Sequence, residues 1–121
     1  MNENLERFLR YVKIDTQSNS ESDTIPSALK ELNLTRLLQK ELLEMGIKSE
    51  IDEYGILYGQ LEGEEGLEPI GLNAHVDTAE ELSGANVNPK IIKNYDGGVI
   101  KLNESYSMSP NEFPGLKKQI G

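Results

Sequence analysis

A stripe of apolar side chains between residues 28 and 45 constrains the fold of this chain more than any other feature. Its members recur at helical spacing and share one face: Leu34, Leu37, Leu38, Leu42 and Met45. Gly46 follows where a left-handed cap residue belongs, and Ile47 is placed to pack back on Leu42 in a Schellman arrangement. The pattern predicts an amphipathic core helix from about Ala28 to Met45 with a defined end.

Weaker patterns on both sides of this helix predict further elements. A first helix should end near Ile14, because apolar residues recur there at i, i+3, i+4 and i+7: Leu5, Phe8, Leu9 and Val12. Asn2 or Asn4 is placed to cap it. The polar residues 15–27 predict a loop. Strands are expected at 47–52 and 56–61 around a turn at 53–55, and the short links favour antiparallel neighbours.

The apolar run 69–74 predicts a third, buried strand after a turn at 63–66. Beyond Thr78, short strands are expected at 90–93 and 99–102 around a tight turn at 96–98. Residues 103–112 should form a polar loop, followed by a short helix that opens with Pro114 at its first position. Helices packed on a partial mixed β-sheet make an α/β fold, and no domain boundary is evident in residues 1–121.

Composition narrows the classes of function. The formal net charge of -9 argues against nucleic acid, whose phosphates would be repelled, and no apolar run approaches the length of a membrane span. The chain lacks cysteine, which fits a reducing compartment. The 36% of hydrophobic residues is ordinary for a folded soluble domain. We therefore expect a cytoplasmic protein that binds neither nucleic acid nor membrane.

The candidate for chemistry is His75, the single histidine, together with Asp77. Residues two apart on a strand share a face, so a carboxylate there can fix the tautomer of the imidazole, as in metal sites. On spacing alone a structural histidine and a metal ligand are both open. A catalytic zinc needs about three protein ligands, and with no cysteine a complete site would have to draw on carboxylates that the sequence does not mark. The acidic pairs Glu64-Glu65 and Glu80-Glu81 are expected to be solvated surface charge.

No other catalytic arrangement is supported. The sequence contains neither a Gly-x-Ser-x-Gly elbow nor a phosphate-binding glycine loop.

The run Gly71–Thr78 (GLNAHVDT) resembles the first metal motif of the M20 metallopeptidases, a family of di-zinc aminopeptidases and carboxypeptidases. More closely, the chain is similar to the amino-terminal part of the tripeptide aminopeptidases in that family. Further similar segments follow in the same order along the chain: residues 6–12, 15–18, 83–89, 94–98, 109–110 and 113–114. The resemblance therefore covers essentially the whole chain. Asn73 departs from it, because relatives have an apolar residue there.

The resemblance implies that His75 is a ligand of one of two zinc ions. It also implies that Asp77 is the catalytic acidic residue that holds this imidazole and tunes the metal. The family's bridging aspartate, its Glu-Glu pair, another aspartate and a last histidine follow in later motifs, which this sequence does not contain.

The sequence therefore predicts that residues 1–121 are a single, incomplete catalytic-domain fragment of a zinc-dependent tripeptide aminopeptidase. The whole enzyme would remove the N-terminal residue from tripeptides, and this chain alone should be inactive. The alternative is a non-catalytic peptide- or protein-binding module on the same scaffold. Its incomplete sheet favours self-association.

Overall fold

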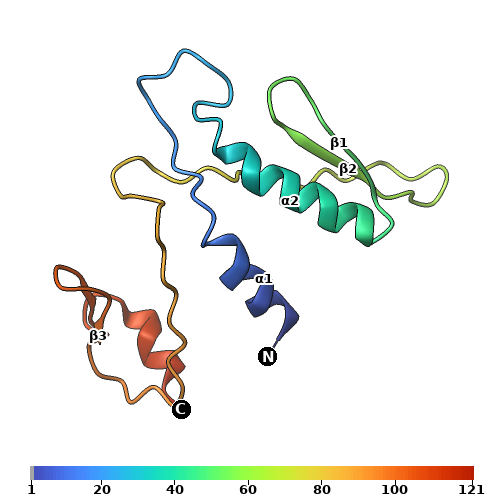
Figure 1. The fold of residues 1–121 in the computed structure, drawn as a ribbon. Coiled ribbons are helices and arrows are strands. Elements are labelled where there is room, and N and C mark those ends of the chain that lie inside the picture. Colours follow the sequence, from blue (N-terminus) through green and yellow to red (C-terminus); the bar gives the residue numbers. More distant parts are fainter. Residues whose placement is uncertain (1) are drawn as a thin grey trace. The chain divides into compact units, whose positions relative to one another are not determined.

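The computed structural model describes residues 2–121, which fall into two compact units, one up to Pro89 and one from Lys90 to Gly121. The first unit contains two helices and an antiparallel pair of strands, and the second contains a smaller pair and a 3-10 helix (Figure 1). This mixture of helix and short strand is that of a partial α/β domain, as the sequence predicts. Among the residues that the structure describes, no helix has both the length and the apolar character needed to cross a bilayer.

The first helix, α1, spans Glu3–Tyr11 and is capped as the sequence predicts. The Asn2 side chain accepts a hydrogen bond from the Asn4 backbone N–H at 2.9 Å, which satisfies a donor that has no partner within the helix. Glu3 adds negative charge at the positive end of the helix dipole. The helix ends three residues before the predicted Ile14.

The second helix, α2, spans Glu31–Glu44 and forms the centre of the first unit. It begins later than predicted because Ala28 to Lys30 form a turn: the Glu31 side chain accepts a hydrogen bond from the Ala28 N–H at 2.9 Å. The predicted end is confirmed. Gly46 has φ +77°, its N–H donates to the Leu43 carbonyl, and the Ile47 N–H donates to the Leu42 carbonyl at 2.9 Å. These bonds define the Schellman motif.

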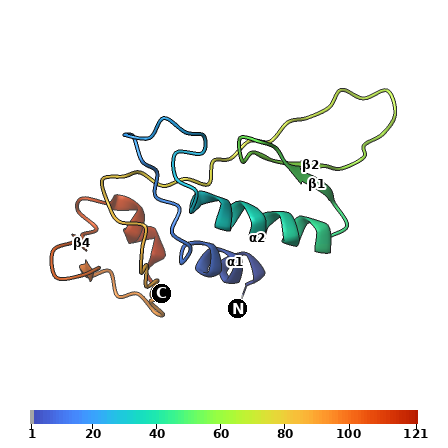
Figure 2. The ribbon, with the colours of Figure 1, turned by 45° about the horizontal axis from the view of Figure 1, so that its top comes forward.

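An antiparallel hairpin of β1 (Lys48–Ile51) and β2 (Leu57–Gln60) packs against α2 (Figure 2). The predicted turn between the strands is confirmed, and the Asp52 carboxylate organises it by accepting the backbone N–H groups of Tyr54 and Ile56. A Cβ added to Gly59 would lie 3.1 Å from Leu42 Cδ1. Glycine at this position therefore lets the strand approach the helix closely. Leu34, 8% exposed, is the most buried leucine of the unit.

A polar cluster joins α1 to α2. Arg10 Nη2 donates to Glu41 Oε1 at 2.5 Å, and the Tyr11 hydroxyl donates to the other oxygen of the same carboxylate. Burial raises the pKa of Glu41, but the bonds from Tyr11 and Arg10 outweigh it, so the net pKa lies below its usual value. Burial and the Glu41 carboxylate both raise the pKa of Tyr11. The Glu41 carboxylate thus joins two residues of α1 to α2.

The predicted strand at 69–74 does not form. The segment is extended but exposed, with Ile70 at 90% and Leu72 at 97%. A buried strand needs neighbours that satisfy its backbone and cover its side chains. Each of the two strand pairs closes on a partner close in sequence, and no strand among the described residues lies beside 69–74. Asn73 is accordingly exposed as well.

The second unit contains one of its two predicted strands, the one at 99–102. Residues 90–93 form no strand; instead β3 (Ile100–Lys101) pairs antiparallel with β4 (Ser107–Met108), which lies in the predicted polar loop. The Asn103 side chain stabilises the connecting turn, because its oxygen accepts the N–H groups of Ser105 and Tyr106. The turn at 96–98 is confirmed, with Gly97 at φ +86°. The helix that begins at Pro114 is also present, as 3-10 helix η1 (Pro114–Gln119).

Candidate functional site

His75 and Asp77 contact each other, although the strand from which their shared face was predicted does not form. The His75 Nδ1 atom lies 3.1 Å from Asp77 Oδ1 and 2.9 Å from the Asp77 backbone oxygen. The His75 side chain is 83% exposed. The pair therefore sits on the surface of the unit, and the carboxylate and carbonyl face one ring nitrogen only.

This geometry selects one tautomer of the imidazole. Two oxygen acceptors at Nδ1 favour the form in which Nδ1 carries the proton and donates it. In that form the Nε2 lone pair is left free to bind a ligand. A carboxylate or carbonyl that orients the second ring nitrogen is the usual companion of a metal-ligating histidine.

The pair does not make a complete metal centre by itself. Among residues 2–121, no group of three or more His, Cys, Asp or Glu side chains is placed to hold a metal ion. A catalytic zinc takes about three protein ligands, and the described residues provide one histidine with its orienting carboxylate. The residues present fit one corner of a zinc site and do not fit the whole site.

The chain that follows Asp77 is fixed to the loop that follows α1. Residues Gln17 and Thr78 form a parallel β-bridge: the Ser18 N–H donates to the Thr78 carbonyl at 2.9 Å, and the Thr78 N–H donates to the Thr16 carbonyl at 3.0 Å. Thr16 is only 2% exposed. This bridge anchors the site pair from its carboxyl-terminal side.

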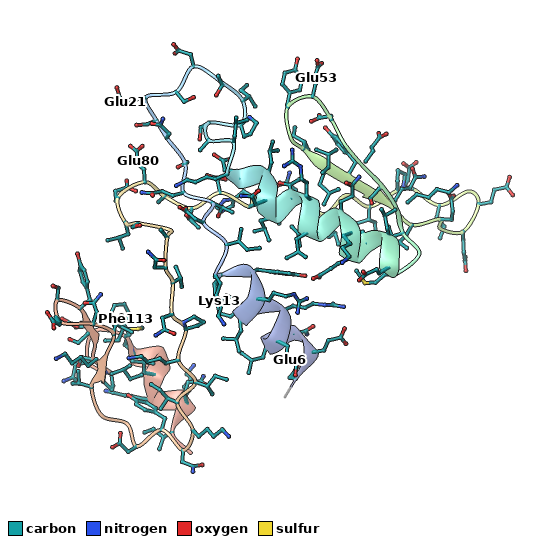
Figure 3. The ribbon with its side chains drawn as sticks, viewed as in Figure 1. Glu6, Lys13, Glu21, Glu53, Glu80 and Phe113 are labelled. Carbon is teal, nitrogen blue, oxygen red and sulfur yellow. The ribbon has the colours of Figure 1, made fainter. Side chains whose placement is uncertain are left out.

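A second attachment involves Glu80. Its carboxylate accepts the Ser20 backbone N–H at 2.8 Å and the Ser20 hydroxyl at 2.6 Å, and its carbonyl accepts Gln17 Nε2 at 2.8 Å. Figure 3 shows Glu80 beside the loop that carries Glu21. The hydrogen bonds from Ser20 lower the pKa of Glu80. The carboxylate therefore stays ionised and bonded at neutral pH.

Sequence reasoning missed this role of Glu80, which was expected to be solvated charge together with Glu81. The partner of Glu80 is sixty residues away along the chain, and no local pattern marks the pair. The other acidic pair, Glu64-Glu65, lies in an exposed turn as expected.

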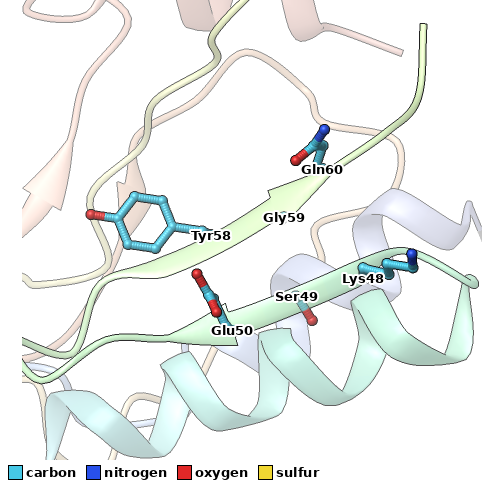
Figure 4. A pocket seen from close by; sticks show the side chains of 6 residues that line it. All are labelled: Lys48, Ser49, Glu50, Tyr58, Gly59 and Gln60. Carbon is cyan, nitrogen blue, oxygen red and sulfur yellow. The ribbon is translucent and has the colours of Figure 1, made fainter.

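A shallow hollow of about 500 Å³ lies on the hairpin (Figure 4). It is lined by Lys48, Ser49, Glu50, Tyr58, Gly59 and Gln60. Register places Glu50 opposite Tyr58 and Lys48 opposite Gln60, which gives a surface of mixed charge. Neither a histidine nor a cysteine is among its lining residues.

The chain is similar along nearly its whole length to proteins named peptidase T. It is 47% identical to the peptidase T of Desulfitobacterium hafniense over 121 residues, which cover 97% of this chain and 30% of the relative. It is 46% identical to that of Lysinibacillus sphaericus over 120 residues, covering 97% of the chain and 29% of the relative. For Bacillus licheniformis the identity is 46% over 125 residues, covering 99% and 30%.

The chain thus spans about 30% of the length of the curated relatives it matches. No family profile matches it.

Proposed function

Because this chain is a homologue of peptidase T over about 30% of that protein's length, we propose that it is the amino-terminal part of a zinc-dependent tripeptide aminopeptidase. Such an enzyme hydrolyses the bond after the first residue of a tripeptide. In this proposal His75 binds one of two zinc ions through Nε2, and Asp77 orients the imidazole from Nδ1. The small peptide substrates of the whole enzyme follow from the same resemblance.

The contact between His75 Nδ1 and Asp77 Oδ1 is the observation that carries the proposal. It gives the histidine the second partner that a zinc-binding imidazole requires, while Nε2 stays open. When bound, the metal pair would polarise the scissile carbonyl and activate water. We propose that the remaining ligands and the general base lie in the part of peptidase T that this chain does not match.

The 121-residue chain should therefore bind zinc weakly and lack peptidase activity. The lack of peptidase activity is tested by incubating the purified chain with a tripeptide and zinc and measuring the amino-terminal residue that is released. Robust turnover by the purified chain would overturn the proposal. Zinc titration tests the weak binding, because the ring signals of His75 are the only histidine signals in the spectrum. We expect them to shift at millimolar zinc in the wild type. A ring that stays unchanged at that concentration would contradict its role as a ligand.

A cytoplasmic location is part of the same proposal. It is supported by the complete absence of cysteine from the sequence, since disulfides typify small domains of oxidising compartments.

The exposed segment at 69–74 favours a second candidate function, that of a module that binds a peptide, a protein or a second copy of itself. Ile70 and Leu72 project apolar surface that nothing in the described chain covers. We expect self-association that rises with concentration in size-exclusion chromatography with light scattering. Leu72→Lys should weaken it, whereas Leu29→Lys, an equally drastic change at an exposed loop leucine, should not. A monomer at all concentrations would remove this candidate.

A further inference from the structure

The chain that carries His75 and Asp77 is held by hydrogen bonds on one side of the pair only. The segment 61–74, which precedes His75, is exposed, and its one backbone hydrogen bond within the described chain, from the Leu67 N–H to the Glu64 carbonyl, closes a local turn. Immediately after Asp77, by contrast, Thr78 and Glu80 bind the loop that follows α1. The hydrogen bonds that hold the chain next to His75 and Asp77 are therefore those of Thr78 and Glu80.

We propose that Glu80 is a positioning residue, whose bonds to Ser20 hold the chain so that Asp77 meets His75 Nδ1. The inference rests on the proposed function, because the orientation of the imidazole matters when Nε2 binds zinc. Glu80 touches neither member of the pair in this arrangement and acts through the backbone of residues 77–79.

A continuous set of contacts links this anchor to the start of α2. Lys30 at the start of α2 binds Asp15 Oδ2 at 2.9 Å, and Asp15 Oδ1 accepts the Gln17 N–H at 3.0 Å. Gln17 then forms the bridge with Thr78 and donates to the Glu80 carbonyl. The bridge is thus connected to α2 through the loop that follows α1 rather than to the exposed segment 61–74.

The backbone of Gly84 lies in close contact with the loop that follows α1. A Cβ at Gly84 would lie 2.7 Å from Asp15 Oδ1 and 3.2 Å from Gln17 Cβ, so its backbone closes over the same loop. The chain between Thr78 and Gly84 therefore contacts the loop at both ends, with Glu80 between them. A carboxylate that accepts two bonds from one serine is well placed to set the register of this contact.

Nuclear magnetic resonance of the 121-residue chain tests the proposal through its single histidine. Ring nitrogen shifts report which nitrogen carries the proton, and exchange of the Thr78 and Ser18 amides with solvent reports the bridge. In the wild type we expect the Nδ1–H tautomer and protected amides. In Glu80→Ala the two amides should exchange about tenfold faster, and the ring should shift towards the tautomer mixture of a free imidazole.

Two further variants keep the test specific. Ser20→Ala removes the hydroxyl bond but keeps the backbone one, so both signals should move in the same direction by a smaller amount. Glu81→Ala is the matched control, because its carboxylate makes no hydrogen bond to the residues that the structure describes, and it should change neither signal. Unchanged amide signals of α2 show that each variant is folded.

A purely structural role for Glu80 predicts faster amide exchange with an unaltered His75 ring, and that result would overturn the proposal. Unaltered amides in Glu80→Ala would overturn it as well. Neither result bears on the proposed function, which fails instead if the wild-type ring does not respond to zinc. The two inferences can therefore fail separately.

Discussion

Residues 31–60 and residues 61–78 both carry apolar patterns, yet only the first region contains an apolar side chain that is buried. In the first region α2 and the hairpin cover each other, and Leu34 is 8% exposed. In the second, Leu72 is 97% exposed on an extended chain without a neighbouring strand. The difference lies in where the partners are: α2 and the hairpin meet within thirty residues, whereas a strand at 69–74 has no partner in the described chain. An apolar pattern indicates which side chains need to be buried, but the partner that covers them must come from another part of the chain.

Truncating a leucine in each region should show the largest contrast. We expect Leu34→Ala to lower the free energy of unfolding by about 3 kcal/mol, because it removes buried methyl groups and leaves a cavity. Leu72→Ala should change it by less than about 0.5 kcal/mol. Urea denaturation followed by circular dichroism at 222 nm measures both. Equal effects would mean that Leu72 is buried in solution and that the contrast between the regions is wrong.

Adding side chains to glycines in the two regions should have a smaller effect. Gly59→Val places methyl groups against Leu42 and Ile47, and we expect a loss of about 2 kcal/mol from overpacking. The same change at Gly63, where a Cβ would meet no atom within 4 Å, should be nearly neutral. The denaturation midpoints of the two variants give the comparison. A neutral Gly59→Val would show that the hairpin does not pack closely on α2.

The smallest effect concerns Glu41, whose carboxylate joins α1 to α2. Glu41→Gln should cost about 1 kcal/mol at pH 7, since one side of the contact with Arg10 is solvent-exposed.

The dependence of this effect on pH has a definite sign. The pKa of Glu41 lies below its ordinary value of 4.5, so its contribution is present above that pH and is lost as the pH falls through the lowered pKa. The pKa of Tyr11 lies above its ordinary value of 10.0, so its contribution is lost as the pH rises through the raised value. The difference in stability between wild type and Glu41→Gln should therefore shrink at both extremes. A difference that stays constant from pH 3 to pH 11 would contradict the attachment through Glu41.

The elements that could be predicted from the sequence are those whose stabilising contacts are close along the chain. The cap at Asn2, the Schellman end at Gly46 and the turn between β1 and β2 all depend on neighbours within a few residues. The prediction of a strand at 69–74 was wrong, because a strand forms only beside a partner strand and the local pattern does not specify one. The prediction of a strand at 90–93 was also wrong, because β3 pairs with β4 instead.

The same distinction between local and long-range contacts applies to the candidate site. His75 and Asp77 do contact each other, but the strand from which their shared face was predicted does not form, so the two-residue spacing alone does not explain the contact. The role of Glu80 was not predictable, because it depends on Ser20, sixty residues away. Only a long-range arrangement of the chain distinguishes Glu80 from Glu81, which has the same chemistry and an adjacent position.

The bridge between Gln17 and Thr78 also bears on how the chain folds. It closes a loop of about sixty residues with two backbone hydrogen bonds, and the entropy lost in closing a loop grows with its length. The α2–hairpin pair needs no such closure, so it should form early, and the bridge should form in the last step of folding of this unit. His75 and Asp77 would thus acquire their fixed geometry only once the rest of the unit is in place.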